Sequence, residues 1–162
     1  MISKKVILTG SFGVGKTSLF NKFIFSKFSE KYLSTIGVTV NKKVLHINGV
    51  DLSIMLWDIA GEVTQDKIPV SYFLNTDAVL YVFDVTRPLT YKDTLINLEF
   101  IKAVYKGEIL KIVANKADLR SEEELAVIKE QVPVPWDILT SAKTGFQVEE
   151  LFETIGIELL AE

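Results

Sequence analysis

GSFGVGKT, residues 10–17, is the most informative stretch of this 162-residue chain. It satisfies the pattern G-x-x-x-x-G-K-S/T, in which a glycine-rich loop between a strand and a helix turns backbone N–H groups toward phosphate. An apolar run at residues 4–9, KKVILT, precedes the loop and predicts a strand. Apolar residues at helical spacing follow the loop and predict a helix over residues 17–25. The motif therefore occurs in the strand-loop-helix context that it requires.

Strand and helix patterns alternate from this loop to the end of the chain. Two β-rich runs joined by Asn48-Gly49 predict a hairpin, because this pair favours the tight turn between antiparallel strands. Residues 78–85 and 109–116 predict buried strands, and a short strand, DIL, follows at residues 137–139. Helical patterns fill the gaps. The sequence thus predicts an α/β fold, a six-stranded, mostly parallel sheet with one antiparallel edge strand and helices on both faces.

Length and composition indicate one globular domain, residues 1–162, with 48% hydrophobic residues for its core. A net charge of -3 provides no basic field, so nucleic acid is not an expected partner. The chain has no cysteine, signal-peptide pattern or apolar run of about 18 residues, so we expect no disulfide, lipidated cysteine or transmembrane segment. We expect a cytoplasmic monomer whose peripheral membrane association would need a partner or a tail that is missing from this sequence.

The loop chemistry points to a nucleotide with magnesium. Lys16 is expected to reach the β and γ phosphates, and the Thr17 hydroxyl to ligate Mg²⁺. The alternative is a glycine-rich turn with a surface lysine, which the strand-loop-helix context disfavours. By itself the motif leaves ATPases, kinases and GTPases open. The nucleotide contacts expected from this segment are Gly13, Val14, Gly15, Lys16, Thr17 and Ser18.

Two later motifs favour guanine. In NKAD, residues 115–118, the Asp118 carboxylate can accept from both N1–H and the exocyclic amine of guanine, a donor pair that adenine lacks. In TSAK, residues 140–143, the Ala142 N–H can donate to guanine O6. Alone, either motif could be an ordinary turn, but their order after the phosphate loop favours a guanine site. The expected contacts here are Asn115, Lys116, Asp118, Ser141, Ala142 and Lys143.

With these motifs in place, the chain resembles the Ras superfamily of small GTPases, and its Rab-like and Ras-like branch most closely. The segments GSFGVGKT, YLSTIGV, WDIAGE, NKAD and SAK occur in the family's order over essentially the whole chain. The resemblance implies a P-loop NTPase G domain, a molecular switch that binds GTP or GDP with Mg²⁺ and hydrolyses GTP. It also implies that Phe28 packs against guanine, that the Lys116 stem covers the base, and that Tyr32 lies over the phosphates.

The resemblance also implies two loops that sense the γ-phosphate. Thr35 in the first would ligate Mg²⁺ together with Thr17 and Asp58, and Gly61 in the second would bring its N–H to the γ-phosphate. Effectors, exchange factors and activating proteins would bind through residues 29–40 and 60–73 of these loops. The residues with an expected catalytic role are Lys16, Thr35, Gly61 and Glu62.

Some positions depart from the family pattern. Phe12 stands where a small residue is usual, and Glu62 stands where most members carry the glutamine that orients water, with Gln65 as a displaced substitute. Arg87 and Arg120, the only arginines, are expected to lie away from both sensing loops, so no arginine finger in cis is evident. These features predict slow hydrolysis. The alternatives are a pseudo-GTPase interaction module and, disfavoured by NKAD and SAK, a P-loop kinase or ATPase.

Overall fold

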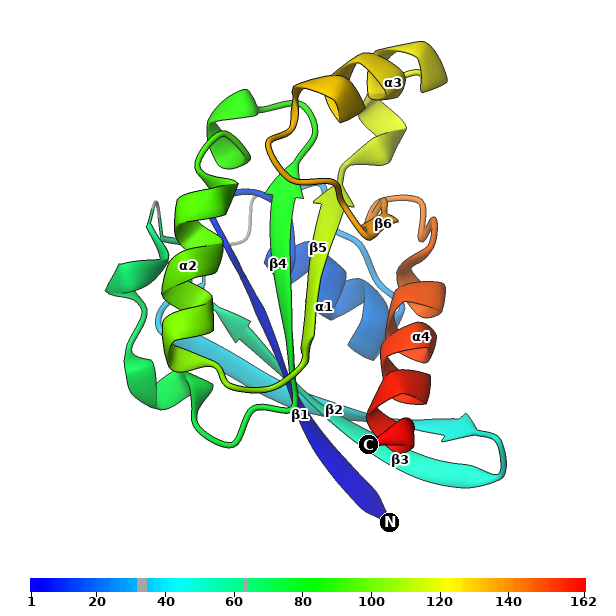
Figure 1. The fold of residues 1–162 in the computed structure, drawn as a ribbon. Helices are drawn as coiled ribbons and strands as arrows, with labels where there is room; N and C mark the ends of the chain where they lie inside the picture. The colour runs from blue at the N-terminus through cyan, green and yellow to red at the C-terminus, as the bar shows by residue number, and fades with distance from the viewer. Residues whose placement is uncertain (32–34, 63) are drawn as a thin grey trace.

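The computed structural model describes residues 1–31, 35–62 and 64–162. Within these ranges six strands form one sheet in the order β2-β3-β1-β4-β5-β6 (Figure 1). Only the β2–β3 pair is antiparallel; the other pairs in the sheet are parallel. The predicted α/β sheet is confirmed. The strands are β1 (Ile2–Gly10), β2 (Val38–Ile47), β3 (Val50–Ile59), β4 (Ala78–Asp84), β5 (Ile109–Asn115) and β6 (Ile138–Leu139).

Helices follow the strands in the alternating order that the patterns predict. Four α-helices occur in the described part of the chain: α1 (Lys16–Phe25), α2 (Thr94–Val104), α3 (Glu122–Gln131) and α4 (Val148–Ala161). Short 3-10 turns lie between them: η1 (Gln65–Lys67), η2 (Val70–Phe73), η3 (Pro88–Thr90) and η4 (Ala117–Leu119).

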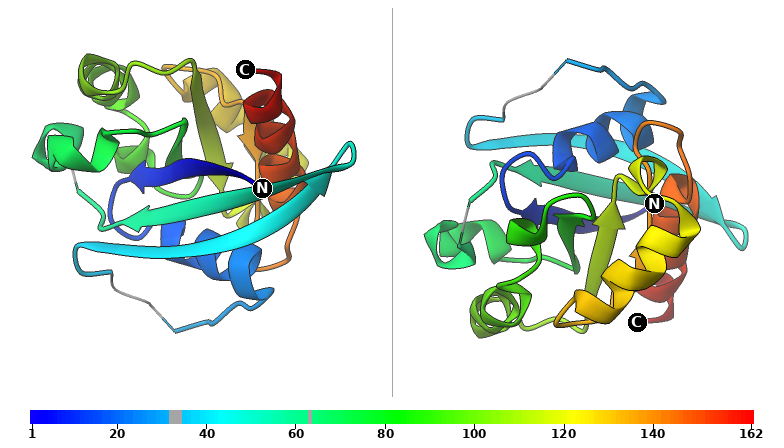
Figure 2. Two further views of the ribbon diagram at one scale, coloured as in Figure 1. Left: turned by 90° about the horizontal axis from the view of Figure 1, so that it is seen from below. Right: turned by 90° about the horizontal axis from the view of Figure 1, so that it is seen from above.

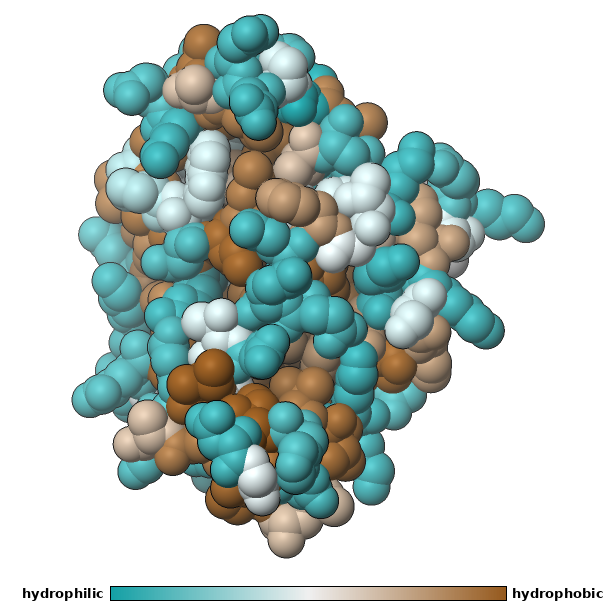
Figure 3. Space-filling view, turned by 90° about the vertical axis from the view of Figure 1, so that its right-hand side faces the viewer, coloured by the Kyte–Doolittle hydropathy of each residue, from teal (hydrophilic) through white to brown (hydrophobic). Residues whose placement is uncertain are grey.

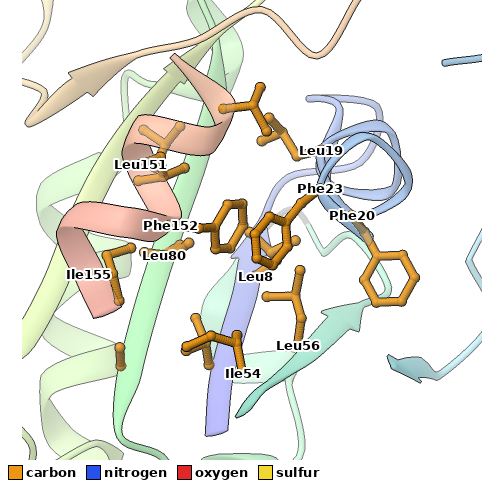
Figure 4. Packing of buried hydrophobic residues seen from close by; sticks show 14 of the residues in the cluster. Leu8, Leu19, Phe20, Phe23, Ile54, Leu56, Leu80, Leu151, Phe152 and Ile155 are labelled. Atoms are coloured by element: carbon orange, nitrogen blue, oxygen red, sulfur yellow. The ribbon is translucent and has the colours of Figure 1, made fainter. Parts of the chain in front are cut away.

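Helices pack on both faces of the sheet, as predicted (Figure 2). One core lies between the sheet, α1 and α4, where the rings of Phe23 and Phe152 stack with centroids 3.8 Å apart (Figure 4). A second core lies on the other face, where α2 contributes Leu98 and Ile101 and α3 contributes Ile128. Two cores hold the sheet rigid, so the loops at the carboxyl ends of its parallel strands have fixed starting points.

The hairpin turn and the strand ends can be compared directly with the sequence patterns. Asn48 and Gly49 have φ values of 50° and 81°, the positive values that a tight hairpin turn requires. The strands predicted over 78–85 and 109–116 each end one residue earlier. The DIL strand contains only its last two residues. Asp137 before them bonds to Ile112 of β5 through its carboxylate, which accepts from the Ile112 N–H at 2.7 Å, and through its backbone N–H, which donates to the Ile112 carbonyl at 2.9 Å.

The surface formed by α3, α4 and the β2–β3 hairpin is mostly hydrophilic (Figure 3). Apolar side chains reach the surface toward its lower end (Figure 3). Val44 of β2 and Ile157 of α4 are about half exposed. Among the described residues, no helix combines the length and the apolar character needed to cross a bilayer.

Candidate functional site

A cleft of about 300 Å³ opens at the carboxyl edge of the sheet. This edge is where ligands bind in open α/β sheets, because the loops that follow parallel strands converge there. The cleft is lined by thirteen of the nucleotide contacts expected from the sequence: Gly13, Gly15, Lys16, Thr17, Ser18, Phe28, Thr35, Gly61, Asn115, Lys116, Asp118, Ala142 and Lys143.

The phosphate loop needs its glycines for conformation and for space. Gly10, Gly13 and Gly15 have φ values of 143°, 75° and 101°, which a side chain disfavours. A Cβ at Gly10 would collide with the Val82 carbonyl, and one at Gly15 with the Asn115 amide. Only glycine therefore allows this loop to lie tightly between β4 and the end of β5.

Lys16 is 5% exposed and lies at the floor of the cleft. Its Nζ donates to the carbonyls of Gly10 and Ser11 at 3.0 and 2.7 Å. Burial lowers the pKa of Lys16 to about 8, and the nearby Asp58 carboxylate opposes that shift. Burial removes the water that would stabilise the charged ammonium group. A phosphate in the cleft would stabilise that charge instead.

Three side chains with oxygen atoms that can ligate a metal meet beside Lys16. The Oγ1 atoms of Thr17 and Thr35 lie 2.5 Å apart and donate to Asp58 Oδ2 at 2.6 and 3.0 Å. Asp58 Oδ1 is buried and accepts no hydrogen bond from the described residues. Burial raises the pKa of Asp58, while the two threonine hydroxyls and Lys16 lower it. Hard oxygen ligands with an unpaired carboxylate oxygen suit Mg²⁺, so these residues fit the expected ion.

At the other end of the cleft, side chains hold the segments that would read a base. Asn115 Nδ2 donates to the Val14 carbonyl at 3.0 Å. Ser141 Oγ donates to Asp118 Oδ1 at 2.8 Å, which orients the carboxylate that lines the cleft. The Ala142 N–H donates to Asn115 Oδ1 at 3.3 Å, a long bond for an amide. Asp118 and Ala142 are therefore preorganised beside one another.

Two of the expected contacts, Val14 and Ser141, do not belong to the cleft lining. Val14 is fully buried and takes part through its carbonyl, and Ser141 acts through Asp118. Tyr32 lies outside the described residues. Phe28 is 37% exposed on the cleft wall, and Lys143 pairs with Glu30 at 3.1 Å across the same opening.

The prediction that Gln65 replaces the missing glutamine is wrong. Gln65 is 3% exposed, and its side-chain carbonyl accepts from the Thr9 hydroxyl inside the protein. Its backbone N–H donates to Asn97 Oδ1 on α2 at 3.2 Å. Packing against α2 thus turns Gln65 away from the cleft. Glu62 is half-buried and does not line the cleft either.

Phe12 and Gly61 meet at the phosphate end of the cleft. Phe12 lines the cleft with 52% of its surface exposed, and a Cβ built at Gly61 would collide with the Phe12 backbone. Arg87 approaches from outside, donating from Nη1 to the Phe12 carbonyl at 3.0 Å. The sequence reasoning missed this contact. The available signal was that Arg87 follows β4, which pairs with β1 directly before the loop.

Comparison with known proteins agrees with this geometry. The model of the Ras family matches residues 5–161. Ras-related protein Rab-1A of Dictyostelium discoideum is 30% identical, over 96% of this chain and 79% of that protein. Ras-related protein Rab-17 of Mus musculus is 34% identical over 96% of this chain and 75% of that protein, and Ras-related protein Rab-4 of Dictyostelium discoideum is 33% identical over 91% and 75%. The chain therefore belongs to the Ras family, as a Rab-like small GTPase.

Proposed function

We propose that this chain is a single-domain guanine-nucleotide switch that hydrolyses GTP slowly and responds poorly to an arginine supplied by an activating protein. Family membership carries the coarser part, a GTP-binding protein of signalling or trafficking with GTP hydrolase chemistry and Mg²⁺. The observation that carries the finer part is Phe12 in the wall of the cleft that Lys16, Thr35 and Gly61 also line, with its backbone against Gly61.

Guanine selectivity is proposed to rest on Asp118 and Ala142. Ser141 holds one oxygen of the Asp118 carboxylate, so the group is fixed before a ligand arrives. A fixed acceptor loses little conformational freedom on binding and can meet the N1–H and amine of guanine. The hydrogen bond from the Ala142 N–H to Asn115 is long and therefore weak, so this N–H can also donate to guanine O6. Adenine would place its amine, a hydrogen-bond donor, against the Ala142 N–H, which is also a donor.

Magnesium, when bound, supplies positive charge at the phosphates, and Thr17, Thr35 and Asp58 are the residues proposed to hold it. Thr35 comes before β2 and Asp58 from β3, and the hydrogen bond between them holds Thr35 at the cleft. Gly61 leads into the second loop. The segments expected to respond most to the nucleotide are residues 29–38 and 60–73, and in the second of these Ile68 and Phe73 are buried in the second core.

Slow turnover is proposed to follow from two side chains. A glutamine both accepts from the attacking water and donates to phosphate, whereas an ionised Glu62 accepts only and adds negative charge. A benzyl group at position 12 would occupy space that an inserted guanidinium needs, and an arginine finger contributes about 10³–10⁵ in rate. A carboxylate can also act as a general base, so the space taken by Phe12 is the stronger argument.

Single-turnover hydrolysis of bound GTP tests this proposal. We would compare wild type, Phe12→Gly and Glu62→Gln, each alone and with extract from the organism that expresses the chain. We expect slow wild-type turnover and a Phe12→Gly variant that the extract accelerates more than its parent. Rapid wild-type turnover without a partner, or equal acceleration of the two proteins, would contradict the proposal.

Phe12 and Glu62 also favour a second candidate, a pseudo-GTPase that keeps nucleotide as a structural ligand. Two measurements separate it from the switch. The nucleotide that co-purifies with the protein is identified after denaturation, and phosphate release is then followed after loading with GTP. Retained, unhydrolysed GTP together with identical hydrogen exchange in the GDP and GTP states would favour the pseudo-GTPase.

A further inference from the structure

Five consecutive carbonyl groups of the phosphate loop each accept a hydrogen bond from a side chain. Lys16 donates to the first two, and residues at the end of β5 and in the segments after β4 and β5 donate to the other three. Because each of these carbonyls is held by a side chain, the loop's conformation is fixed by these bonds as well as by its glycines. The bonds are Lys16 Nζ to Gly10 O at 3.0 Å and Ser11 O at 2.7 Å, Arg87 Nη1 to Phe12 O at 3.0 Å, Lys116 Nζ to Gly13 O at 2.9 Å and Asn115 Nδ2 to Val14 O at 3.0 Å.

Arg87 is the member of this set that lies outside the nucleotide-binding motifs. The turn that carries it is tightly held: the Arg87 N–H donates to the Asp84 carbonyl at 3.1 Å, and its own carbonyl accepts from Thr90 Oγ1 at 2.8 Å. Thr90 is buried and Asp84 fully so. The backbone of Arg87 is therefore fixed beside the phosphate loop, although the guanidinium group is exposed.

We propose that Arg87 is a positioning residue that holds the Phe12–Gly13 peptide so that the Gly13 N–H faces the phosphates. A trans peptide is planar, and its N–H points opposite to its C=O. The Phe12 carbonyl faces Arg87, which is not part of the cleft lining, whereas Gly13 lines the cleft. The N–H on the other side of this peptide is then directed toward the cleft. Arg87 acts through the peptide and does not itself contact the nucleotide.

The charge of Arg87 also strengthens that N–H as a donor. Hydrogen bonds to a charged donor are about twice as strong as neutral ones, and an acceptor bond at C=O polarises the N–H of the same peptide. Lys116 Nζ lies 2.8 Å from Asp84 Oδ2, which offsets its charge. Arg87 forms no ion pair with the residues that the structure describes. Its charge is therefore free to act on the Phe12 carbonyl.

The inference rests on the proposed nucleotide site, and amide NMR with nucleotide dissociation tests it. We would load wild type, Arg87→Ala, Arg87→Gln and Arg87→Lys with Mg²⁺ and GDP or a GTP analogue. The Gly13 amide proton resonance should move upfield in Arg87→Ala, less in Arg87→Gln, and least in Arg87→Lys. The Gly15 amide is an internal reference, because its peptide carbonyl, Val14, is held by Asn115. We also expect the GTP analogue to dissociate about threefold to tenfold faster from Arg87→Ala, as for the loss of one charged hydrogen bond partly screened by water.

Arg120→Ala is the matched control, because Arg120 is an arginine that donates to the Leu119 carbonyl and pairs with Glu124, away from the phosphate loop. A Gly13 resonance that moves no further in Arg87→Ala than in Arg120→Ala would overturn the inference, as would unchanged dissociation. If Arg87→Ala fails to fold, Arg87→Gln gives the same test with a side chain of similar polarity. A wild type that does not retain GTP would instead refute the proposed function, so the two failures are distinguishable.

Discussion

A buried polar network joins the second sensing loop to the sheet and to α2, and its energy can be measured. The Thr9 hydroxyl of β1 donates to the side-chain carbonyl of Gln65, whose backbone N–H donates to Asn97. Asn97 Nδ2 in turn donates to the Tyr81 hydroxyl at 3.0 Å. Thr9, Gln65, Asn97 and Tyr81 are each no more than 3% exposed, so water cannot replace a lost partner.

Thr9→Val removes the donor and keeps the shape of the side chain. The buried Gln65 carbonyl then loses its partner, and an unsatisfied buried polar group costs about 1–3 kcal/mol. Gln65 Nε2 already has no hydrogen-bond partner among the described residues, so Gln65→Met removes a cost as well as a bond. We therefore expect about 2 kcal/mol of destabilisation for Thr9→Val, less than about 1 kcal/mol for Gln65→Met, and a double variant close to wild type.

Chemical unfolding of the GDP-loaded protein measures this double-mutant cycle. The coupling energy should be about 2–3 kcal/mol, and each kcal/mol should correspond to about 2–4 °C in Tm for a chain of this size. Thr39→Val is the control, because it makes the same change at an exposed position of β2. Additive single-variant effects, or a Thr9→Val effect no larger than that of Thr39→Val, would refute the argument from the buried network.

The remaining predictions concern the nucleotide site. Asp118→Ala should weaken GTP binding by several kcal/mol, since charged hydrogen bonds contribute about 1.5–3 kcal/mol each, and competition assays should show that ATP binding does not fall in parallel. Thr17→Ala and chelation of magnesium should each speed nucleotide release, and an unchanged off-rate in both would refute the magnesium assignment. Gly61→Ala should abolish the difference in hydrogen exchange between GTP-analogue and GDP states at residues 60–62, because its Cβ collides with the Phe12 backbone.

Local signals in the sequence predicted most of the fold. The turn at Asn48-Gly49 needs only its own two residues in positive φ, and the glycine and asparagine there allow it. The start of α3 is equally local, because Ser121 and Glu124 bond to one another's backbone N–H groups as a capping box. The DIL strand was predicted one residue too long, because the bond to Ile112 of β5 that involves the Asp137 side chain is not revealed by any local pattern.

In the candidate site too, some features follow from local sequence and others depend on contacts between distant segments. Gly10, Gly13, Gly15 and Lys16 were found because the phosphate loop is one continuous segment whose backbone dictates its residue types. The convergence of this loop with NKAD and SAK could be inferred, because parallel strands deliver their carboxyl ends to one edge. The direction of single side chains could not, because it depends on packing between segments.

Gln65 and Arg87 show why the direction of a side chain cannot be predicted from the sequence. Each is a polar residue in a connecting segment, where exposure is the usual expectation. Gln65 is instead buried through Thr9, 56 positions away, and Asn97, 32 positions away. Arg87 reaches Phe12 across 75 positions and remains exposed while it does so. Both contacts require a partner whose own chemistry is ordinary, a threonine hydroxyl and a backbone carbonyl, so neither partner carries a signal. The structure is therefore most informative about the contacts of polar residues in the segments that follow strands near the phosphate loop.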